Sequence, residues 1–409
     1  MKLDSFAKNI ILVFLGTALL NFFNFLYQLL MAHKFSPEDF AAFNSLLSLS
    51  VLVGTPLVAV STAITKYTAE FNARGELSKI RVLLSGFFKI GLVSSLALIL
   101  IFSVSAPWIM SSLKIPSLSA VYLFAVLIGV SCLSAVVNGG LQGLESFAWV
   151  MASSVISAFS KLFFALAVVI FGLGISGALS GFILSTLLAV VIVVYPLRGI
   201  ITFGALGEKA DYKGIFAYTL PVAVNTFCFS AMVNMDMVMV KHYFEPYQAG
   251  IYSLSQMLGK VFLFLPAAIF MVMFPRASHL NAKNDSTLHI LNRSILYAGA
   301  LCLVAFSFYN IFPVFSLKIL TGKSFSESIA LGRFFSVSMS FFALYWVISL
   351  YFLSLKDTRF LKYAVFFTVI QFIAIIFFHS SLYQVQLALC VNSITLFIIS
   401  LRLAYKRKG

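Results

Sequence analysis

Long apolar segments separated by short polar connections run through the whole chain. Each is about 20 residues or longer, the length that an α-helix needs to cross the hydrocarbon core of a bilayer. Strands of a β-barrel would instead alternate apolar and polar residues. The pattern predicts twelve transmembrane helices, at about residues 9–33, 39–66, 82–111, 119–141, 147–171, 175–197, 214–240, 248–274, 291–317, 327–354, 360–379 and 382–404.

The pattern of the first half returns in the second half at an offset of about 209 residues. Pro37 aligns with Pro246, and neighbouring aromatic and basic positions agree as well. With six helices in each half, both halves enter the membrane in the same direction, so an axis along the membrane normal relates them. We predict two repeated six-helix bundles, residues 1–200 and 201–409, related by a pseudo-two-fold axis.

Composition supports an all-α integral membrane protein. The chain is 61% hydrophobic and 10% charged, with a mean hydropathy of +1.03, whereas soluble domains have about 25% charged residues. The formal net charge is +15, and 19 of the 28 Lys and Arg residues fall in the connections of one side of the membrane. By the positive-inside rule both termini are predicted to be cytoplasmic, in the cell (cytoplasmic) membrane. The basic charge thus gives no reason to expect nucleic acid as a partner.

Asp236 lies in the interior of a predicted helix, whereas the other acidic residues of the chain lie in connections or at the first residue of a predicted helix. An ionised carboxylate facing lipid would cost about 2–3 kcal/mol, so this side chain should face protein or water. The functional hypothesis is an ion-coupling site for H+ or Na+. A structural ion pair, or an interfacial residue that reaches the headgroups, is the alternative.

Basic residues also lie within predicted helices. Lys260 and Lys161 are central in theirs, Gln256 shares a helix face with Lys260, and Arg333 lies about two turns into its helix. Lys260, Lys161 and Arg333 against one Asp would make a net positive cleft, and we predict that these residues and Gln256 bind an anionic substrate such as a phosphate or diphosphate. The alternative is that the arginine reaches the interface and the lysines bond to carbonyl groups.

Further polar residues form a stripe that we predict to line a cavity. The stripe follows one face of the first helix and continues on the seventh at an equivalent position, with the members Thr17, Asn21, Asn24, Gln28 and Asn225. Hydrogen bonding between packed helices would explain the same stripe. Lys66 and Arg276, at equivalent helix ends, are candidates for a cytoplasmic entrance or for ordinary positive-inside residues.

Motifs for catalysis or metal binding are absent from the sequence. The segment Gly172–Gly177 fits G-x-G-x-x-G, but it joins two membrane helices and no strand precedes it. There is no Walker A motif and no H-E-x-x-H, and the four cysteines lie in apolar runs without metal spacing. We predict no enzyme activity, no metal site and no cofactor beyond a coupling ion.

The order of several segments resembles the polysaccharide-export flippases. These belong to the superfamily that also contains multidrug exporters and the lipid II flippase. The segments are FSPEDFAAFNSL, LQGLESF, a seventh helix that carries Asp236, and then AGIYSLSQML and MFPRAS. Together they extend the resemblance over essentially the whole chain.

The resemblance implies a V-shaped pair of six-helix bundles that work by alternating access. The implied substrate is a polyprenyl-diphosphate-linked oligosaccharide, moved from the cytoplasmic to the outer leaflet for surface polysaccharide synthesis, with ion coupling through Asp236. The implied partners are this lipid-linked substrate, membrane lipids and other polysaccharide-synthesis membrane proteins.

Two alternatives to this function remain at the level of sequence. A proton- or sodium-coupled multidrug exporter of the same superfamily should have a cleft richer in Asp and Glu than in Lys and Arg, and the helices here show the reverse. A non-transporting scaffold of a polysaccharide-synthesis complex is the second alternative.

Overall fold

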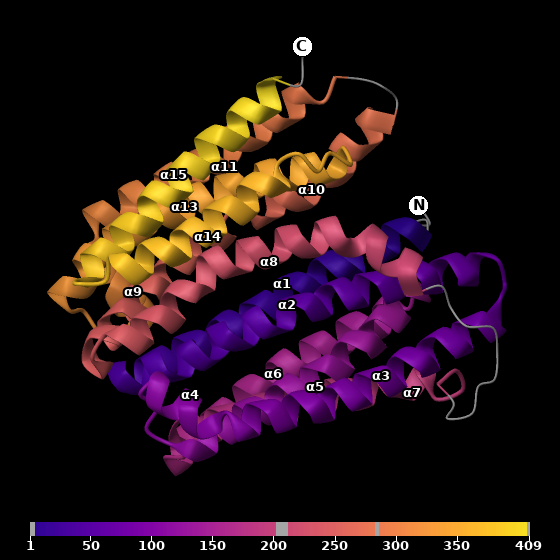
Figure 1. Ribbon diagram of the computed structural model, residues 1–409, viewed down its shortest axis with the longest axis horizontal. Helices are drawn as coiled ribbons and strands as arrows, with labels where there is room; N and C mark the ends of the chain where they lie inside the picture. Colours follow the sequence, from indigo (N-terminus) through magenta and orange to yellow (C-terminus); the bar gives the residue numbers. More distant parts are fainter. Residues whose placement is uncertain (1–4, 202–211, 283–285, 407–409) are drawn as a thin grey trace. The chain divides into compact units, whose positions relative to one another are not determined.

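The computed structural model describes residues 5–201, 212–282 and 286–406, and all of its regular secondary structure is helical (Figure 1). The helices of the first half are α1 (Ser5–Lys34), α2 (Pro37–Ala73), α3 (Leu77–Val104), α4 (Ala106–Ser112), α5 (Leu118–Gly143), α6 (Phe147–Phe171) and α7 (Gly174–Leu197). Those of the second half are α8 (Tyr212–Tyr243), α9 (Pro246–Phe264), α10 (Ala267–Ala282), α11 (Leu288–Ile311), α12 (Pro313–Thr321), α13 (Ser326–Ser354), α14 (Leu361–Phe377) and α15 (Leu382–Lys406). The predicted all-α fold is confirmed.

The helices match the twelve predicted segments, three of which are divided in two. The eighth segment divides into α9 and α10 at Pro266, and the ninth into α11 and α12 just before Pro313. Proline has no backbone N–H to continue a helix and favours a first helical turn, which explains both divisions. Pro56 precedes Pro266 by 210 residues, close to the offset of the repeat, but it lies inside the unbroken helix α2. These prolines of the two halves therefore act differently.

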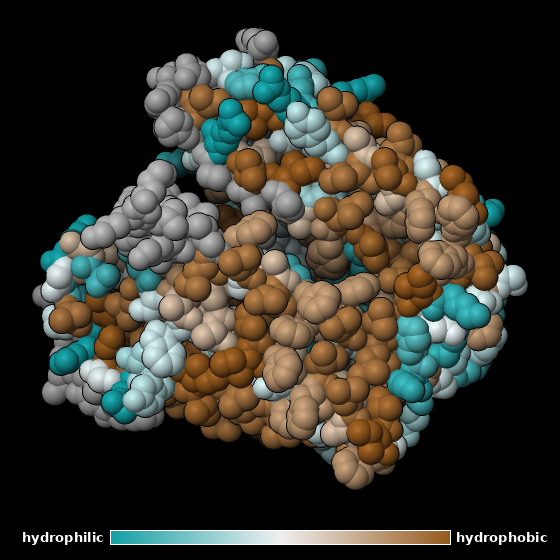
Figure 2. All heavy atoms as spheres, turned by 180° about the vertical axis from the view of Figure 1, so that it is seen from behind, coloured by the Kyte–Doolittle hydropathy of each residue, from teal (hydrophilic) through white to brown (hydrophobic). Residues whose placement is uncertain are grey.

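The structure describes a multi-pass membrane protein. Ten helices among the described residues are long and apolar enough to cross a membrane, and α14 is a shorter apolar helix. Large apolar side chains such as Ile170, Phe171 and Phe377 are exposed, at 73–76% of their surface. Figure 2 shows apolar side chains spread broadly over one face of the molecule. A surface of this kind suits contact with lipid chains rather than water.

The chain forms two compact units. The first contains α1, the later part of α2 from Val53, α3 to α7, and the start of α8 up to Ala223. The second contains Phe35–Leu52 and everything from Val224 onward. The predicted boundary between residues 200 and 201 adjoins residues outside the described part and stays a prediction.

Small residues allow close helix packing in the first unit. A Cβ atom added to Gly139 would lie 2.7 Å from the Ser61 backbone oxygen, and one added to Gly143 would lie 2.5 Å from Thr68 Cβ. These glycines are one helical turn apart on α5, so the backbones of α5 and α2 approach closely along this line. The Thr65 hydroxyl also donates a hydrogen bond to the Gly139 carbonyl, at 3.1 Å.

In the second unit, the start of α2 packs against the start of α9. Asn44 Nδ2 donates a hydrogen bond to Ser253 Oγ at 2.8 Å, and these residues are 209 positions apart. Gly250 packs against Pro37, where an added Cβ would lie 2.6 Å from backbone and side-chain carbons. Equivalent positions of a repeat meet in this way at a pseudo-two-fold axis, so the contact supports the duplication seen in the sequence.

The loop after α12 holds the beginning of α2 within the same unit. Lys323 Nζ donates a hydrogen bond to the Phe35 carbonyl at 2.6 Å. Burial lowers the pKa of Lys323, and the carboxylate of Glu38 partly offsets this by raising it. The ammonium group is therefore partly desolvated where it fixes the first turn of α2.

Candidate functional site

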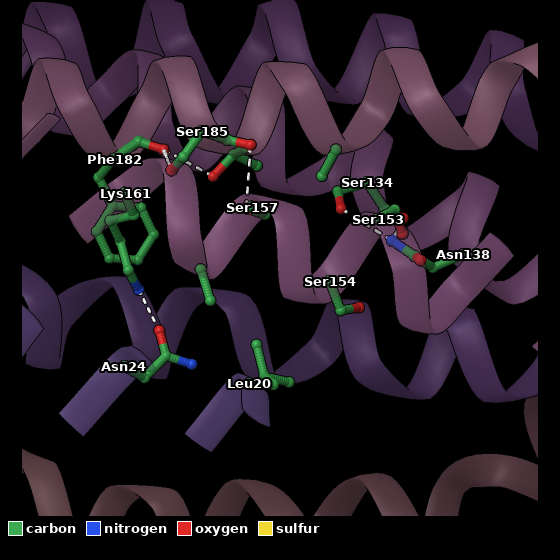
Figure 3. A pocket seen from close by; sticks show the side chains of 13 residues that line it. Leu20, Asn24, Ser134, Asn138, Ser153, Ser154, Ser157, Lys161, Phe182 and Ser185 are labelled. Atoms are coloured by element: carbon green, nitrogen blue, oxygen red, sulfur yellow. Dashed lines mark hydrogen bonds between the residues drawn. The ribbon is translucent and has the colours of Figure 1, made fainter. Parts of the chain in front are cut away.

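A polar cavity of about 210 Å³ lies inside the first unit, between helices α1, α5, α6 and α7 (Figure 3). Nine of its thirteen lining residues are polar, which is unusual for a helix bundle at membrane depth. They are Asn24, Ser134, Asn138, Ser153, Ser154, Ser157, Lys161, Ser185 and Thr186.

Lys161 supplies the positive charge of this cavity. The side chain is 9% exposed, and its Nζ donates a hydrogen bond to Asn24 Oδ1. Nζ also lies 4.3 Å from the ring centre of Phe182 and 4.9 Å from that of Tyr27. An amide oxygen and aromatic faces attract an ammonium group but carry no net negative charge.

The helices around Lys161 offer no carboxylate. Helices α1, α3, α5, α6 and α7 contain no Asp or Glu in their described residues. A buried charge without a counter-charge is costly, and the usual remedy is a paired ion. The cavity therefore has a net positive charge that suits an anionic ligand.

A second polar cluster surrounds Asp236 in the second unit. Asp236 is fully buried; its Oδ2 accepts a hydrogen bond from the Tyr252 hydroxyl at 2.8 Å. Gln256 Nε2 donates to both carboxylate oxygens, at 3.0 and 3.1 Å. Gln386 Nε2 donates to the Tyr252 hydroxyl at 3.1 Å. The carboxylate is thus held by side chains from α9, with support from α15.

Lys260 belongs to the Asp236 cluster. It lies near enough to interact electrostatically with Asp236. Within the described part of the chain, no ion pair at 4.0 Å or less includes either residue. The partly buried Lys260 of the second unit therefore has a carboxylate nearby, whereas the helices around Lys161 in the first unit offer none.

The other predicted residues take varied positions. Gln256 is used to hold Asp236, and Arg333 is exposed on α13. Asn21 is also exposed, on α1. The predicted anion-binding residues are thus divided between the two units, with Lys161 in the first and the other three in the second.

The residues of the predicted polar stripe differ in burial and in contacts. Thr17 and Gln28 are partly buried on α1, and Asn24 contacts Lys161. Asn225 is fully buried, and neither side-chain amide atom has a hydrogen-bond partner among the described residues. A buried amide without partners is rare in folded proteins and marks a place where a water, a ligand or a second conformation is needed.

The predicted entrance residues lie in different units. Lys66 is partly buried on α2, with its Nζ 5.2 Å from the ring centre of Tyr67. Arg276 is exposed on α10. Their role at a cytoplasmic entrance stays a prediction.

Several polar residues within the helices of both units were not predicted from the sequence. On α5, Ser134 and Asn138 line the cavity and are four residues apart, a helical spacing that would have revealed them. In the second unit, Asn392 Nδ2 donates to Gln371 Oε1 at 2.8 Å, and Gln371 Nε2 donates to the Met232 carbonyl at 2.7 Å. In each case the sequence signal that could have indicated these residues is a polar side chain within an apolar helix.

Among the described residues, no group of three or more His, Cys, Asp or Glu could hold a metal ion. The four cysteines are buried and free, as expected for small core residues.

Comparison with protein families decides the family of this chain. Residues 6–281 match the family described as "Polysaccharide biosynthesis protein". The chain belongs to this family. No curated protein matches the sequence significantly.

Solved structures of similar fold are transporters and flippases. An inward-facing multidrug resistance MATE family transporter of the MOP superfamily has a TM-score of 0.81, with 14% identity over 95% of this chain and 96% of that chain. The lipid II flippase MurJ in an inward closed conformation has a TM-score of 0.76, with 16% identity over 97% of this chain and 87% of that chain.

A third similar structure is a MOP superfamily transporter from Pyrococcus furiosus, described as having a reversed polarity of its binding pocket. Its TM-score is 0.52, with 13% identity over 98% of this chain and 94% of that chain. At these identities the structures establish the fold. The chain has the fold of MOP superfamily transporters, and its relatives are not enzymes, in agreement with the sequence-based expectation.

Proposed function

We propose that the protein is a flippase that moves a polyprenyl-diphosphate-linked oligosaccharide from the cytoplasmic to the outer leaflet by alternating access. Membership of the polysaccharide biosynthesis family and the transporter fold support a role in moving a component of such a pathway. A lipid-linked sugar brings a negative charge in its diphosphate and hydroxyl groups in its sugars.

The observation that carries this proposal is the buried Lys161 in a cavity without a carboxylate. A cationic drug would be repelled by this ammonium group, whereas a phosphate or carboxylate would neutralise it. The charge of the cavity therefore favours a lipid-linked sugar over the cationic substrates of a multidrug exporter.

The test is transport in liposomes that contain the purified protein. We expect a fluorescent polyprenyl-diphosphate sugar to cross the bilayer faster than in protein-free liposomes, and a cationic dye to show no such effect. Expulsion of the dye without movement of the sugar lipid would identify a drug exporter. Movement of neither, by folded protein with and without H+ or Na+ gradients, would favour a scaffold.

We further propose that Asp236 couples transport to H+ or Na+. Its carboxylate is fully buried, and the nearby Gln386 Oε1 is buried without a hydrogen-bond partner among the described residues. A proton or cation bound by the carboxylate would change the charge of this cluster, which also contains Lys260. The response of an Asp236→Asn variant to ion gradients tests this role.

A further inference from the structure

The donors and acceptors of the first-unit cavity are arranged unevenly. Figure 3 shows Lys161 and Asn24 toward one end, and Ser134, Asn138 and Ser153 toward the other. Lys161 Nζ has hydrogens beyond the one given to Asn24 Oδ1, and Asn24 Nδ2 donates to no described residue. This end therefore offers hydrogen-bond donors and a positive charge.

Most hydroxyl groups of the cavity donate their hydrogen bond to a backbone carbonyl group. Ser157 Oγ donates to the Ser185 carbonyl at 3.0 Å, and Ser153 Oγ donates to the Val150 carbonyl at 2.9 Å. Ser185 and Thr186 donate in the same way to the Phe182 carbonyl, both at 2.8 Å. Their oxygens keep lone pairs that accept hydrogen bonds, so a ligand beside them must supply donors.

The side chains of Asn138 and Ser154 add hydrogen-bond acceptors and one unused hydroxyl donor to the part of the cavity away from Lys161. Asn138 Nδ2 donates to both oxygens of Ser134, at 2.9 and 3.1 Å, which leaves Asn138 Oδ1 as an acceptor. Ser154 Oγ forms no hydrogen bond with a described residue. A phosphate ion, rich in acceptors and poor in donors, would satisfy only the Lys161 end.

The cavity is also larger than a lone ion needs. Its volume of about 210 Å³ is well over ten times the roughly 15 Å³ that one buried water requires. One six-membered sugar ring with an attached acidic group is of the right order. Ring hydroxyls donate and accept, which suits the serine-rich end.

We propose that this cavity binds a single sugar ring carrying an anionic oxygen group. Lys161 Nζ and Asn24 Nδ2 hold the anionic oxygens, and the serine and asparagine oxygens accept hydrogen bonds from the ring hydroxyls. The anionic group has two sources, the phosphate next to the first sugar of a lipid-linked substrate or the carboxylate of an acidic sugar. This assignment rests on the proposed function, because that function implies that the sugar ring belongs to a lipid-linked substrate. Binding of the ring to the cavity can be tested separately from transport.

The test is saturation-transfer NMR on the full-length protein in detergent with four soluble probes, which are glucose 1-phosphate, glucuronic acid, glucose and inorganic phosphate. We expect at least one anionic sugar to bind roughly tenfold or more tightly than both glucose and inorganic phosphate. Preference for glucose 1-phosphate identifies the phosphate source, and preference for glucuronic acid identifies an acidic sugar. Equal binding of inorganic phosphate would overturn the sugar assignment.

Matched variants localise the binding. Lys161→Met should weaken the preferred probe by roughly ten- to a hundredfold, because a charged hydrogen-bond donor is lost. Lys89→Met removes an exposed lysine on α3 outside the cavity and should leave binding unchanged. Ser154→Leu fills the cavity without removing a hydrogen bond to a described residue, and so blocks binding in a second, independent way.

Several outcomes would contradict the proposal. Folded Lys161→Met and Ser154→Leu proteins that bind the probe as well as wild type would place the site elsewhere. Failure of both anionic sugars to bind, with transport of the lipid-linked sugar intact, overturns the cavity assignment and leaves the proposed function standing. Binding without any transport supports the cavity and overturns the flippase.

Discussion

Lys161 and Lys260, one in each unit, have opposite electrostatic surroundings. Lys260 interacts with Asp236, and Lys161 lies among an amide, aromatic rings and serine residues. Burying an uncompensated charge lowers the stability of a fold. A residue such as Lys161 is therefore expected to have a function, for example binding a ligand of opposite charge. The contrast supports the proposed anion binding in the first unit, while a carboxylate compensates the lysine charge in the second.

Both lysines could be predicted from the sequence, but the pairing of Lys161 with Asn24 could not. Ser154 and Ser157 precede Lys161 by seven and four residues on one helix, so helical periodicity alone puts them on its face. The contact between Lys161 and Asn24 joins residues 137 positions apart. The spacing of residues within one helix does not show which face of another helix packs against them. The pairing of Lys161 with Asn24 could therefore be seen only in the structure.

Asp236→Asn tests the coupling role at the level of one residue. The amide cannot carry the negative charge, so transport should lose its response to H+ or Na+ gradients. The measurement is the initial transport rate in liposomes with and without each gradient. The free energy of unfolding should also fall by roughly 1–3 kcal/mol, because one amide donor would face Gln256 Nε2 without an acceptor.

Tyr252→Phe is the control for that prediction. It removes one hydrogen bond to the carboxylate but leaves its charge in place. We expect a gradient response as in wild type, with reduced thermal stability. A normal gradient response of Asp236→Asn would show that this carboxylate does not couple transport.

Helices were predicted well where hydropathy alone determines them. All twelve apolar segments form helices, three of them interrupted, since length and composition decide whether a segment can cross a bilayer. The division at Pro266, and the continuous helix through Pro56, depend on packing around each proline. Hydropathy likewise does not reveal that Phe35–Leu52 packs in the second unit.

Gly143→Ala tests the close packing of α5 on α2. The new methyl group would lie 2.5 Å from Thr68 Cβ and 2.7 Å from the Thr65 carbonyl oxygen. Such overpacking should lower the free energy of unfolding by about 1–3 kcal/mol. The measurement is thermal or denaturant unfolding of the purified protein in detergent.

Gly54→Ala provides the matched control on α2. No atom lies within 4 Å of an added Cβ at this position. Alanine favours a helix more than glycine does, so the expected effect is a stabilisation of up to about 1 kcal/mol. Equal effects of the two substitutions would show that helix propensity, rather than the contact between α5 and α2, dominates at Gly143.

At the scale of the whole molecule, the internal repeat and the family agree. The hydrogen bond between Asn44 and Ser253 joins equivalent positions of the two halves, and the fold is that of MOP superfamily transporters. The repeated architecture nevertheless carries unequal chemistry, because the first-unit helices around Lys161 lack the carboxylate found in the second. The sequence indicated the repeat through proline and aromatic positions, whereas the separation of the two clusters emerged from the structure.

The most direct test of this account is the rate at which a fluorescent polyprenyl-diphosphate sugar crosses liposome bilayers containing wild type, Lys161→Met or Lys89→Met protein. We expect wild type and Lys89→Met to transport at similar rates. Lys161→Met should be slower by roughly tenfold or more at low substrate concentration, because it loses a charged contact with the anionic headgroup. Unchanged transport by correctly folded Lys161→Met protein would contradict the central role of the buried ammonium group.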